Sequence, residues 1–264
     1  MSQMGLDTNL AGHTALVCGA SQGIGQATAI LLAQMGASVV LLARTEEKLK
    51  ITLDQLPRPS AHRILAIDLL DRQKLKQQLQ KVLKIHPIDI LVCNAGGPKA
   101  GPLMDADESA FVEAFESHVL ANQLLVQLCL PTMRQQNYGR IINIISTSVR
   151  QPIPQLGVSN TIRSAVAAWS KTLSLELAPV GITVNNILPG YTLTPRLDDL
   201  LETDRQRRQI SRSEAEQAWK KAVPLGRFAE PKEVANAIGF LASPAASYIT
   251  GVSLAVDGGR ISAI

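Results

Sequence analysis

The chain has 264 residues, of which 46% are hydrophobic, 18% are charged and only 3% are aromatic. This composition excludes a disordered chain, and it predicts a core filled by aliphatic side chains, as in a parallel sheet covered by helices. The formal net charge is +4 at pH 7 and no basic run is interleaved with aromatic residues, so we do not expect nucleic-acid binding.

Short apolar runs alternate with longer amphipathic segments along the whole chain. In chain order we expect a strand at residues 14–18, a helix at 23–35, a strand at 38–43, a helix at 46–56, a strand at 63–67, a helix at 72–85, a strand at 89–93, a helix at 111–133 interrupted near Pro131, a strand at 141–145, a helix at 160–177, a strand at 183–187, a helix at 231–241 and a strand at 253–256. Strands that alternate with long helices require right-handed crossovers and a parallel sheet. The sequence therefore predicts one α/β domain over residues 1–264, a doubly wound (Rossmann) parallel sheet with helices on both faces.

Residues 197–222 stand apart from this alternation because they are charged and helix-prone. They carry four arginines, Arg205, Arg207, Arg208 and Arg212. The segment is an insertion between the sixth strand and the helix at 231–241, above the carboxyl ends of the strands, where ligands bind in such folds. Two interpretations stay open: a lid over a substrate, and a solvated pair of surface helices.

A glycine pattern follows the first strand directly and opens the first helix. It reads Gly19-Ala20-Ser21-Gln22-Gly23-Ile24-Gly25. Glycine lets the backbone turn tightly and approach a pyrophosphate, and the helix N-terminus offers unpaired N–H groups to the phosphates. The pattern predicts a dinucleotide site, and the alternative is a plain tight turn.

The second strand ends at Ala43-Arg44-Thr45, where an NAD-binding chain would carry an acidic residue. Arg44 can instead pair with a 2′-phosphate, so we expect NADP, and NAD less; the alternative is that Arg44 only ends a strand at the surface. Asp68, after the third strand, is placed to contact the adenine. The segment Asn94-Ala95-Gly96, after the fourth strand, brings backbone close to the adenosine ribose.

Together these residues resemble the short-chain dehydrogenase/reductase family, over about residues 12–259. Further matching motifs are Pro189-Gly190 followed by Thr194, residues 224–227, residues 248–251 and residues 256–259. Within the family the chain is most similar to 3-oxoacyl-carrier-protein reductases. The resemblance implies that Pro189, Gly190 and Thr194 also bind the cofactor, and that the protein forms a homotetramer or homodimer packed partly through the helices at 111–133 and 160–177.

The chemistry of this family uses an asparagine, a serine, a tyrosine and a lysine. The resemblance places them at His118, Ser146, Ser159 and Arg163, so that only the serine is retained. None of the three tyrosines of the chain is followed four residues later by a lysine. A serine is a much weaker acid than a tyrosine, and an arginine can stabilise an anion or touch the nicotinamide ribose but cannot relay a proton.

Three hypotheses follow from this altered site. In the first, the chain is a reductase with a substitute acid, either Tyr191, which follows Pro189-Gly190, or His118, whose pKa suits proton transfer. Ser146 and Arg163 would then polarise the carbonyl or bind a carboxylate. In the second, the chain binds NADP and does different or slow chemistry. In the third, it is a non-catalytic NADP-binding protein or sensor.

The expected substrate is a small carbonyl or alcohol compound, with a 3-oxoacyl thioester as one candidate. The arginine-rich insertion favours an anionic one. Cys18, Cys93 and Cys129 show no paired spacing, which predicts buried small hydrophobic residues and neither a disulfide nor a metal site. No apolar stretch is long enough to span a membrane and no secretory signal is evident, so we expect a cytoplasmic protein.

Overall fold

The structure is a computed structural model, and it describes residues 5–263 of the chain. Seven parallel strands form one sheet in the order β3-β2-β1-β4-β5-β6-β7. They are β1 (Thr14–Cys18), β2 (Ser38–Ala43), β3 (Arg63–Ala66), β4 (Ile90–Cys93), β5 (Gly139–Ile144), β6 (Ile182–Pro189) and β7 (Ser253–Val256). The strand order reverses between β1 and β4, and in doubly wound sheets ligands bind at the carboxyl ends of the strands on either side of that point.

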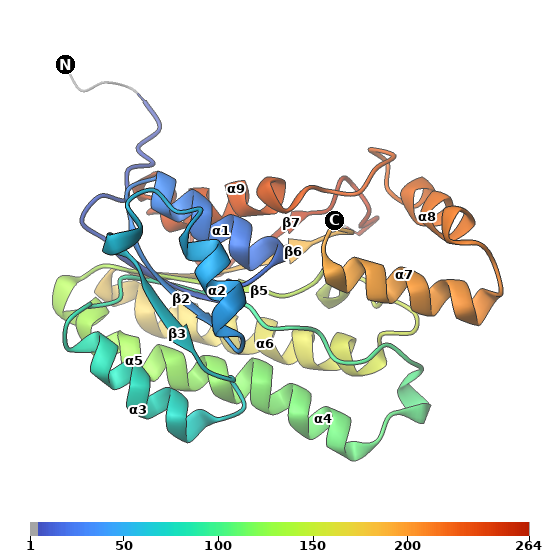
Figure 1. The fold of residues 1–264 in the computed structure, drawn as a ribbon, viewed down its shortest axis with the longest axis horizontal. Coiled ribbons are helices and arrows are strands. Elements are labelled where there is room, and N and C mark those ends of the chain that lie inside the picture. Colours follow the sequence, from blue (N-terminus) through green and yellow to red (C-terminus); the bar gives the residue numbers. More distant parts are fainter. Residues whose placement is uncertain (1–4, 264) are drawn as a thin grey trace.

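Helices cover both faces of this sheet (Figure 1). They are α1 (Gly23–Gln34), α2 (Glu46–Leu53), α3 (Arg72–Leu83), α4 (Glu108–Phe115), α5 (Ala121–Gln136), α6 (Gly157–Leu177), α7 (Pro195–Arg208), α8 (Arg212–Lys221) and α9 (Pro231–Ala242). Helices α1 and α9 lie on one face, and α3, α5 and α6 lie on the other. The predicted doubly wound fold is confirmed.

Strands β1, β2 and β4 are buried on both faces, which explains their nearly uninterrupted apolar sequences. In β1, Ala15 and Val17 pack into the core under α1 and α9, whereas Leu16 and Cys18 pack into the core on the opposite face. Successive strand residues point to opposite faces, so a strand covered on both sides needs an apolar residue at every position. The three cysteines are buried and free, as predicted.

The long helix predicted at residues 111–133 breaks at a different place. Helix α5 continues through Pro131, and the irregularity is a π-helical turn at Glu116–Leu120 between α4 and α5. Pro131 has no backbone N–H, so the carbonyl of Gln127 lacks its intrahelical hydrogen-bond donor. Both residues are exposed, and the solvent can donate a hydrogen bond to that carbonyl instead. The prediction of an interruption near Pro131 is therefore wrong, and the π turn carries His118.

The predicted insertion at residues 197–222 is a pair of helices, α7 and α8, which begins two residues earlier than expected. The hydroxyl of Thr194 caps α7, and Ser211 with Glu214 forms a capping box on α8. Buried apolar residues hold the pair against the loop before α9; they are Leu197, Leu201, Ala215 and Phe228.

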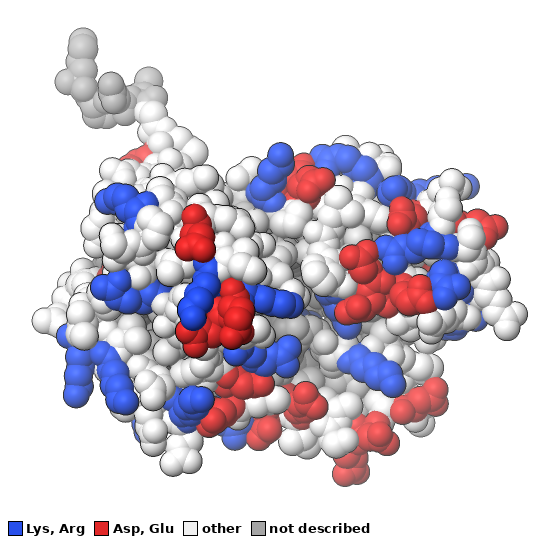
Figure 2. Space-filling view, viewed as in Figure 1, with Lys and Arg blue, Asp and Glu red and all other residues white. Residues whose placement is uncertain are grey.

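The four arginines predicted in this segment are engaged in ion pairs on its surface. They are Arg205 with Glu202, Arg207 and Arg208 with Asp204, and Arg212 with Asp198 and Glu216. Figure 2 shows the resulting interleaved blue and red side chains over α7 and α8. These arginines therefore do not form a basic surface, and they give no support to the expectation of an anionic substrate.

Within residues 5–263, no helix combines the length and the apolar content that crossing a membrane requires.

Candidate active site

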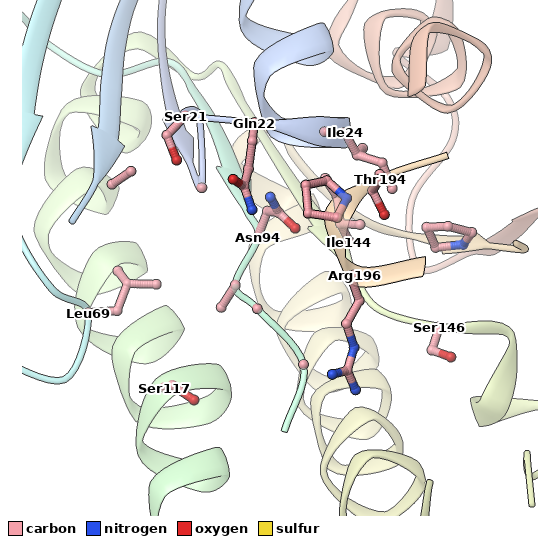
Figure 3. Close-up of a pocket in the computed structure, with 18 of the residues that line it drawn as sticks. Ser21, Gln22, Ile24, Leu69, Asn94, Ser117, Ile144, Ser146, Thr194 and Arg196 are labelled. Atoms are coloured by element: carbon pink, nitrogen blue, oxygen red, sulfur yellow. The ribbon is translucent and has the colours of Figure 1, made fainter. Parts of the chain in front are cut away.

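A cleft lies at the carboxyl ends of the strands, where the strand order reverses. Its volume is about 550 Å³, within the roughly 300–1,000 Å³ of small-molecule sites. Figure 3 shows side chains from separate loops converging on it. The predicted residues that line it are Gly19, Ser21, Gln22, Gly23, Ile24, Arg44, Asp68, Asn94, Ala95, Gly96, Ser146, Ser159, Arg163, Pro189, Gly190, Tyr191 and Thr194. Of the predicted site residues, Gly25 and His118 do not line it.

The turn between β1 and α1 has no room for side chains at its glycines. Gly19 and Gly23 have φ angles of +62° and +57°, in the left-handed region that favours glycine. A β-carbon on Gly19 would lie 2.5 Å from Nδ2 of Asn94, and one on Gly25 would collide with the carbonyl oxygen of Gly19. The backbone is therefore bare and tightly folded at the edge of the cleft.

The N-terminus of α1 offers hydrogen-bond donors to the cleft. Gln22 is the N-cap residue of α1, and its side chain makes no capping hydrogen bond. The first N–H groups of a helix have no intrahelical partner, and together with the helix dipole they form an anion site. The bare glycine turn and the uncapped helix therefore fit the pyrophosphate of a dinucleotide.

Two cations line the end of the cleft next to β2. Arg44 and Lys48 are both exposed there, and within residues 5–263 Arg44 makes no ion pair. Lys48 was not predicted, although its place in the first turn of the helix that follows Arg44 could have indicated it. Across the cleft, Oδ1 of Asp68 accepts a hydrogen bond from the N–H of Leu70 at 3.0 Å, which fixes the direction of that carboxylate.

Helix α6 starts three residues earlier than predicted, so it carries both Ser159 and Arg163, one turn apart. Both side chains are over 90% buried and both line the cleft. Ser146 lies at the end of β5, and its Oγ accepts a hydrogen bond from the N–H of Ser148 at 3.0 Å, which leaves its own hydroxyl hydrogen to donate. Two hydroxyls and a guanidinium therefore share this part of the cleft.

The Arg163 guanidinium joins two strand ends. Its Nη1 donates to the carbonyl oxygen of Ile144 at 2.9 Å and its Nη2 to that of Ala95 at 3.3 Å. Burial, and next the nearby charge of Arg196, lower the pKa of Arg163 to about 10. The side chain therefore stays protonated at neutral pH, as a fixed cation.

His118 lies on the π turn, is 3% exposed and is not among the residues that line the cleft. Burial, and next the charge of Arg163, lower the pKa of His118 to about 2. A neutral imidazole at every working pH cannot be the acid that protonates a substrate. The prediction that His118 has a pKa suited to proton transfer is therefore wrong, because the sequence did not show how deeply the helix buries it.

Replacing His118 by glutamine is expected to make the protein less sensitive to acid. In the unfolded chain this histidine takes up a proton below about pH 6.5, whereas in the folded chain it does so only near pH 2. As the pH falls between these two values, His118 therefore lowers the free energy of unfolding by up to about 1.4 kcal/mol per pH unit. Urea unfolding of both proteins between pH 7.5 and 4.5 measures the slope. Equal slopes would contradict a buried neutral His118.

Tyr191 lines the cleft and also packs in the cluster that holds α7 and α8. Its ring stacks on Trp219 with centroids 4.5 Å apart and meets Phe228 edge-on at 6.1 Å. The guanidinium carbon of Arg260 lies 4.5 Å from its centroid. Three side chains therefore hold the ring of Tyr191 in place beside the cleft.

Arg196 also lines the cleft, although the sequence motifs did not predict it. It lies in the first turn of α7, and its Nη2 donates to the carbonyl oxygen of Pro98 at 2.6 Å. Its position two residues after Thr194, at the end of a predicted cofactor motif, was the available signal.

The profile of a protein family described as enoyl-(acyl carrier protein) reductase matches residues 19–260. A 3-oxoacyl-acyl-carrier-protein reductase of Rickettsia conorii is 34% identical over 253 residues, which cover 96% of this chain and 98% of that protein. The chain belongs to the short-chain dehydrogenase/reductase family. The predicted resemblance to 3-oxoacyl reductases is confirmed.

Solved structures of the family have the same fold over nearly the whole chain. The L-sorbose reductase of Gluconobacter frateurii, complexed with NADPH and L-sorbose, has a TM-score of 0.90 at 31% identity, covering 98% of this chain and 100% of that one. An NADPH-dependent reductase involved in bacilysin biosynthesis has a TM-score of 0.89 at 29% identity, covering 96% and 99%.

Proposed function

We propose that the chain is an NADP-dependent oxidoreductase that interconverts a carbonyl compound and its alcohol. One observation carries the proposal: a single cleft holds a phosphate-binding turn at one end and two hydroxyls beside a buried guanidinium at the other. Two relatives with the same fold are an NADPH-dependent reductase and a sugar reductase complexed with NADPH, which supports the same assignment.

The residues at the glycine turn bind the cofactor phosphates in this proposal. The N–H groups at the start of α1 hold the pyrophosphate, and Arg44 with Lys48 holds the 2′-phosphate. The adenine contacts Asp68. The nicotinamide end lies along residues 94–96, Pro189, Gly190 and Thr194. When bound, the nicotinamide ring supplies or accepts the hydride.

The chain's own residues orient the carbonyl and supply the proton. Ser146 and Ser159 donate hydrogen bonds to the carbonyl oxygen, and the cation of Arg163 stabilises negative charge on that oxygen. Arg163 stays protonated, so the proton comes from another group. Among the described residues that line the cleft, Tyr191 carries the single phenol. Its O–H transfers the proton to the substrate oxygen, and the Arg260 guanidinium over the ring stabilises the phenolate that is left.

Helices α7 and α8 act as a lid in the same proposal. Leu197 and Leu200 of α7 line the cleft, and Arg196 reaches across it to the loop after β4. A homodimer or homotetramer packed through α4 and α6 also fits the exposed apolar side chains of Val112 and Leu175 on these helices.

Replacing Arg44 by aspartate is expected to reverse the cofactor preference. The wild-type protein should bind NADPH at least about tenfold more tightly than NADH. This factor corresponds to the free energy of one charge-assisted hydrogen bond between Arg44 and the 2′-phosphate. The variant loses that pair and gains a carboxylate for the ribose hydroxyls. Fluorescence titrations with both nucleotides measure the four dissociation constants.

Arg58→Asp is the matched control for this experiment, because it makes the same charge change at an exposed arginine outside the cleft. It should leave both dissociation constants unchanged. Equal affinity of the wild-type protein for NADPH and NADH would contradict the role of Arg44, and no binding of either nucleotide would contradict the proposed function as a whole.

A further inference from the structure

Besides Arg44 next to β2, two arginines line the cleft without a carboxylate to balance them, Arg163 and Arg196. Within residues 5–263 neither Arg163 nor Arg196 makes an ion pair, and their side chains donate only to the backbone carbonyl oxygens of Ile144, Ala95 and Pro98. The charges also act on each other, since Arg196 lowers the pKa of Arg163. By contrast, the arginines on the surface of α7 and α8 are paired with acids.

The acidic residues near the cleft do not neutralise this pair. Asp68 lies at the other end, after β3, and is hydrogen-bonded to the N–H of Leu70. Glu113 lines the cleft from α4 but is exposed and makes no ion pair among the described residues. Asp199, one turn beyond Arg196, acts on that residue electrostatically but lies outside ion-pair distance. The positive charge at Arg163 and Arg196 is therefore left for a ligand.

The positive charge of Arg163 and Arg196 lies beside Ser146 and Ser159, the two hydroxyls that donate to the substrate carbonyl in the proposed function. Arg163 is one turn from Ser159 on α6. Arg196 belongs to α7, and Figure 3 shows its side chain between the loop of Asn94 and Ser146, on the side away from Gln22. Its guanidinium packs against Gly97, where a β-carbon would come within 3.2 Å of Nη2. Arg196 therefore faces the substrate end of the cleft and not the phosphate-binding turn.

We propose that the substrate is a small oxo acid whose free carboxylate binds Arg196. Its carbonyl group then faces Ser146 and Ser159, with Arg163 adding to the positive field around both groups. A planar guanidinium with several N–H donors matches a carboxylate in two-point geometry. This inference rests on the proposed oxidoreductase function and names its substrate class. It favours an oxo acid over a 3-oxoacyl thioester, which has no carboxylate next to its reacting carbonyl.

Two matched pairs of probes test the inference without turnover: 2-oxobutanoate and 3-oxobutanoate, each with its methyl ester. Isothermal titration calorimetry measures their binding to the free protein and to the protein saturated with NADP⁺. The wild-type protein is expected to bind at least one acid about 10- to 100-fold more tightly than its ester. Arg196→Gln should reduce that ratio to about one by weakening the acid, and Arg196→Lys, which keeps the charge without the planar fork, should give an intermediate ratio.

Arg212→Gln is the matched control, because it removes a guanidinium that is already paired with Asp198 and Glu216 on the lid surface. It should leave the acid-to-ester ratio unchanged. Equal binding of acid and ester by the wild-type protein overturns the inference. So does an Arg196→Gln protein that loses NADPH affinity about tenfold and keeps the acid-to-ester ratio, since Arg196 would then serve the cofactor. Failure of the wild-type protein to bind NADPH contradicts the proposed function instead, and the titrations of the free protein still report on the carboxylate.

Discussion

A Gly25→Ala protein is expected to bind NADPH at least about 100-fold more weakly than the wild-type protein. The new β-carbon would collide with the carbonyl oxygen of Gly19, which belongs to the backbone and not to a flexible side chain. Gly19 cannot move aside freely, because it packs against Asn94 and the next residue, Ala20, donates its N–H to Leu42 at 3.2 Å. Relief of the collision therefore has to open the turn.

Opening the turn removes donors from the phosphate site. Two lost hydrogen bonds to a charged group, each worth about 1.5–3 kcal/mol, correspond to a factor of at least about 100 in affinity. The added methyl group should also lower the free energy of unfolding by about 1–3 kcal/mol, as overpacking does. NADPH fluorescence titration and urea unfolding separate the two effects. Gly101→Ala is the control, because a β-carbon there meets no atom within 4 Å. An unchanged dissociation constant in the Gly25 variant would mean that this turn does not hold the phosphates.

The sequence was sufficient for the sheet because burial on both faces leaves a direct signal. A strand such as β2, Ser38–Ala43, reads as an unbroken apolar run, since its residues pack alternately into two cores. The glycine turn was equally predictable from the sequence, because the spacing of its glycines follows from backbone contacts within a few residues that leave no room for a β-carbon. Local rules therefore predicted the fold and the glycine turn at the edge of the cleft.

The part of the cleft around Arg163 and Arg196 could not be predicted in this way, because it depends on contacts between distant segments. Arg196 meets Pro98 across 98 positions of the chain. The burial that keeps His118 neutral comes from a π turn, which has no clear sequence pattern. The ion pairs of α7 were in principle visible, since Arg205 follows Glu202 by three residues and Arg208 follows Asp204 by four. The expectation of an anionic substrate took no account of these acidic neighbours.

A Tyr191→Phe protein is expected to reduce an accepted carbonyl substrate about 10²- to 10⁴-fold more slowly, the usual effect of losing a general acid. The phenyl ring keeps the stacking on Trp219 and the edge contact with Phe228, so the lid and the cleft should stay intact. The NADPH dissociation constant and the unfolding midpoint should therefore not change. The measurement is kcat on a carbonyl substrate, with the other two quantities as internal controls.

Tyr191→Leu gives the contrast that separates chemistry from packing. It removes the hydroxyl and also the stacked ring, so it should slow turnover to a similar extent and in addition weaken the contact of α8, through Trp219, with the rest of the cluster. If the phenylalanine variant is as fast as the wild-type protein and only the leucine variant is slow, Tyr191 acts by holding the lid. The proton must then come from the Ser146 or Ser159 hydroxyl or from solvent, because Arg163 stays protonated and His118 stays neutral at neutral pH. In that case the positive field of Arg163 and Arg196 would be the main contribution of the cleft to the proposed reaction, since it stabilises negative charge on the substrate oxygen wherever the proton originates.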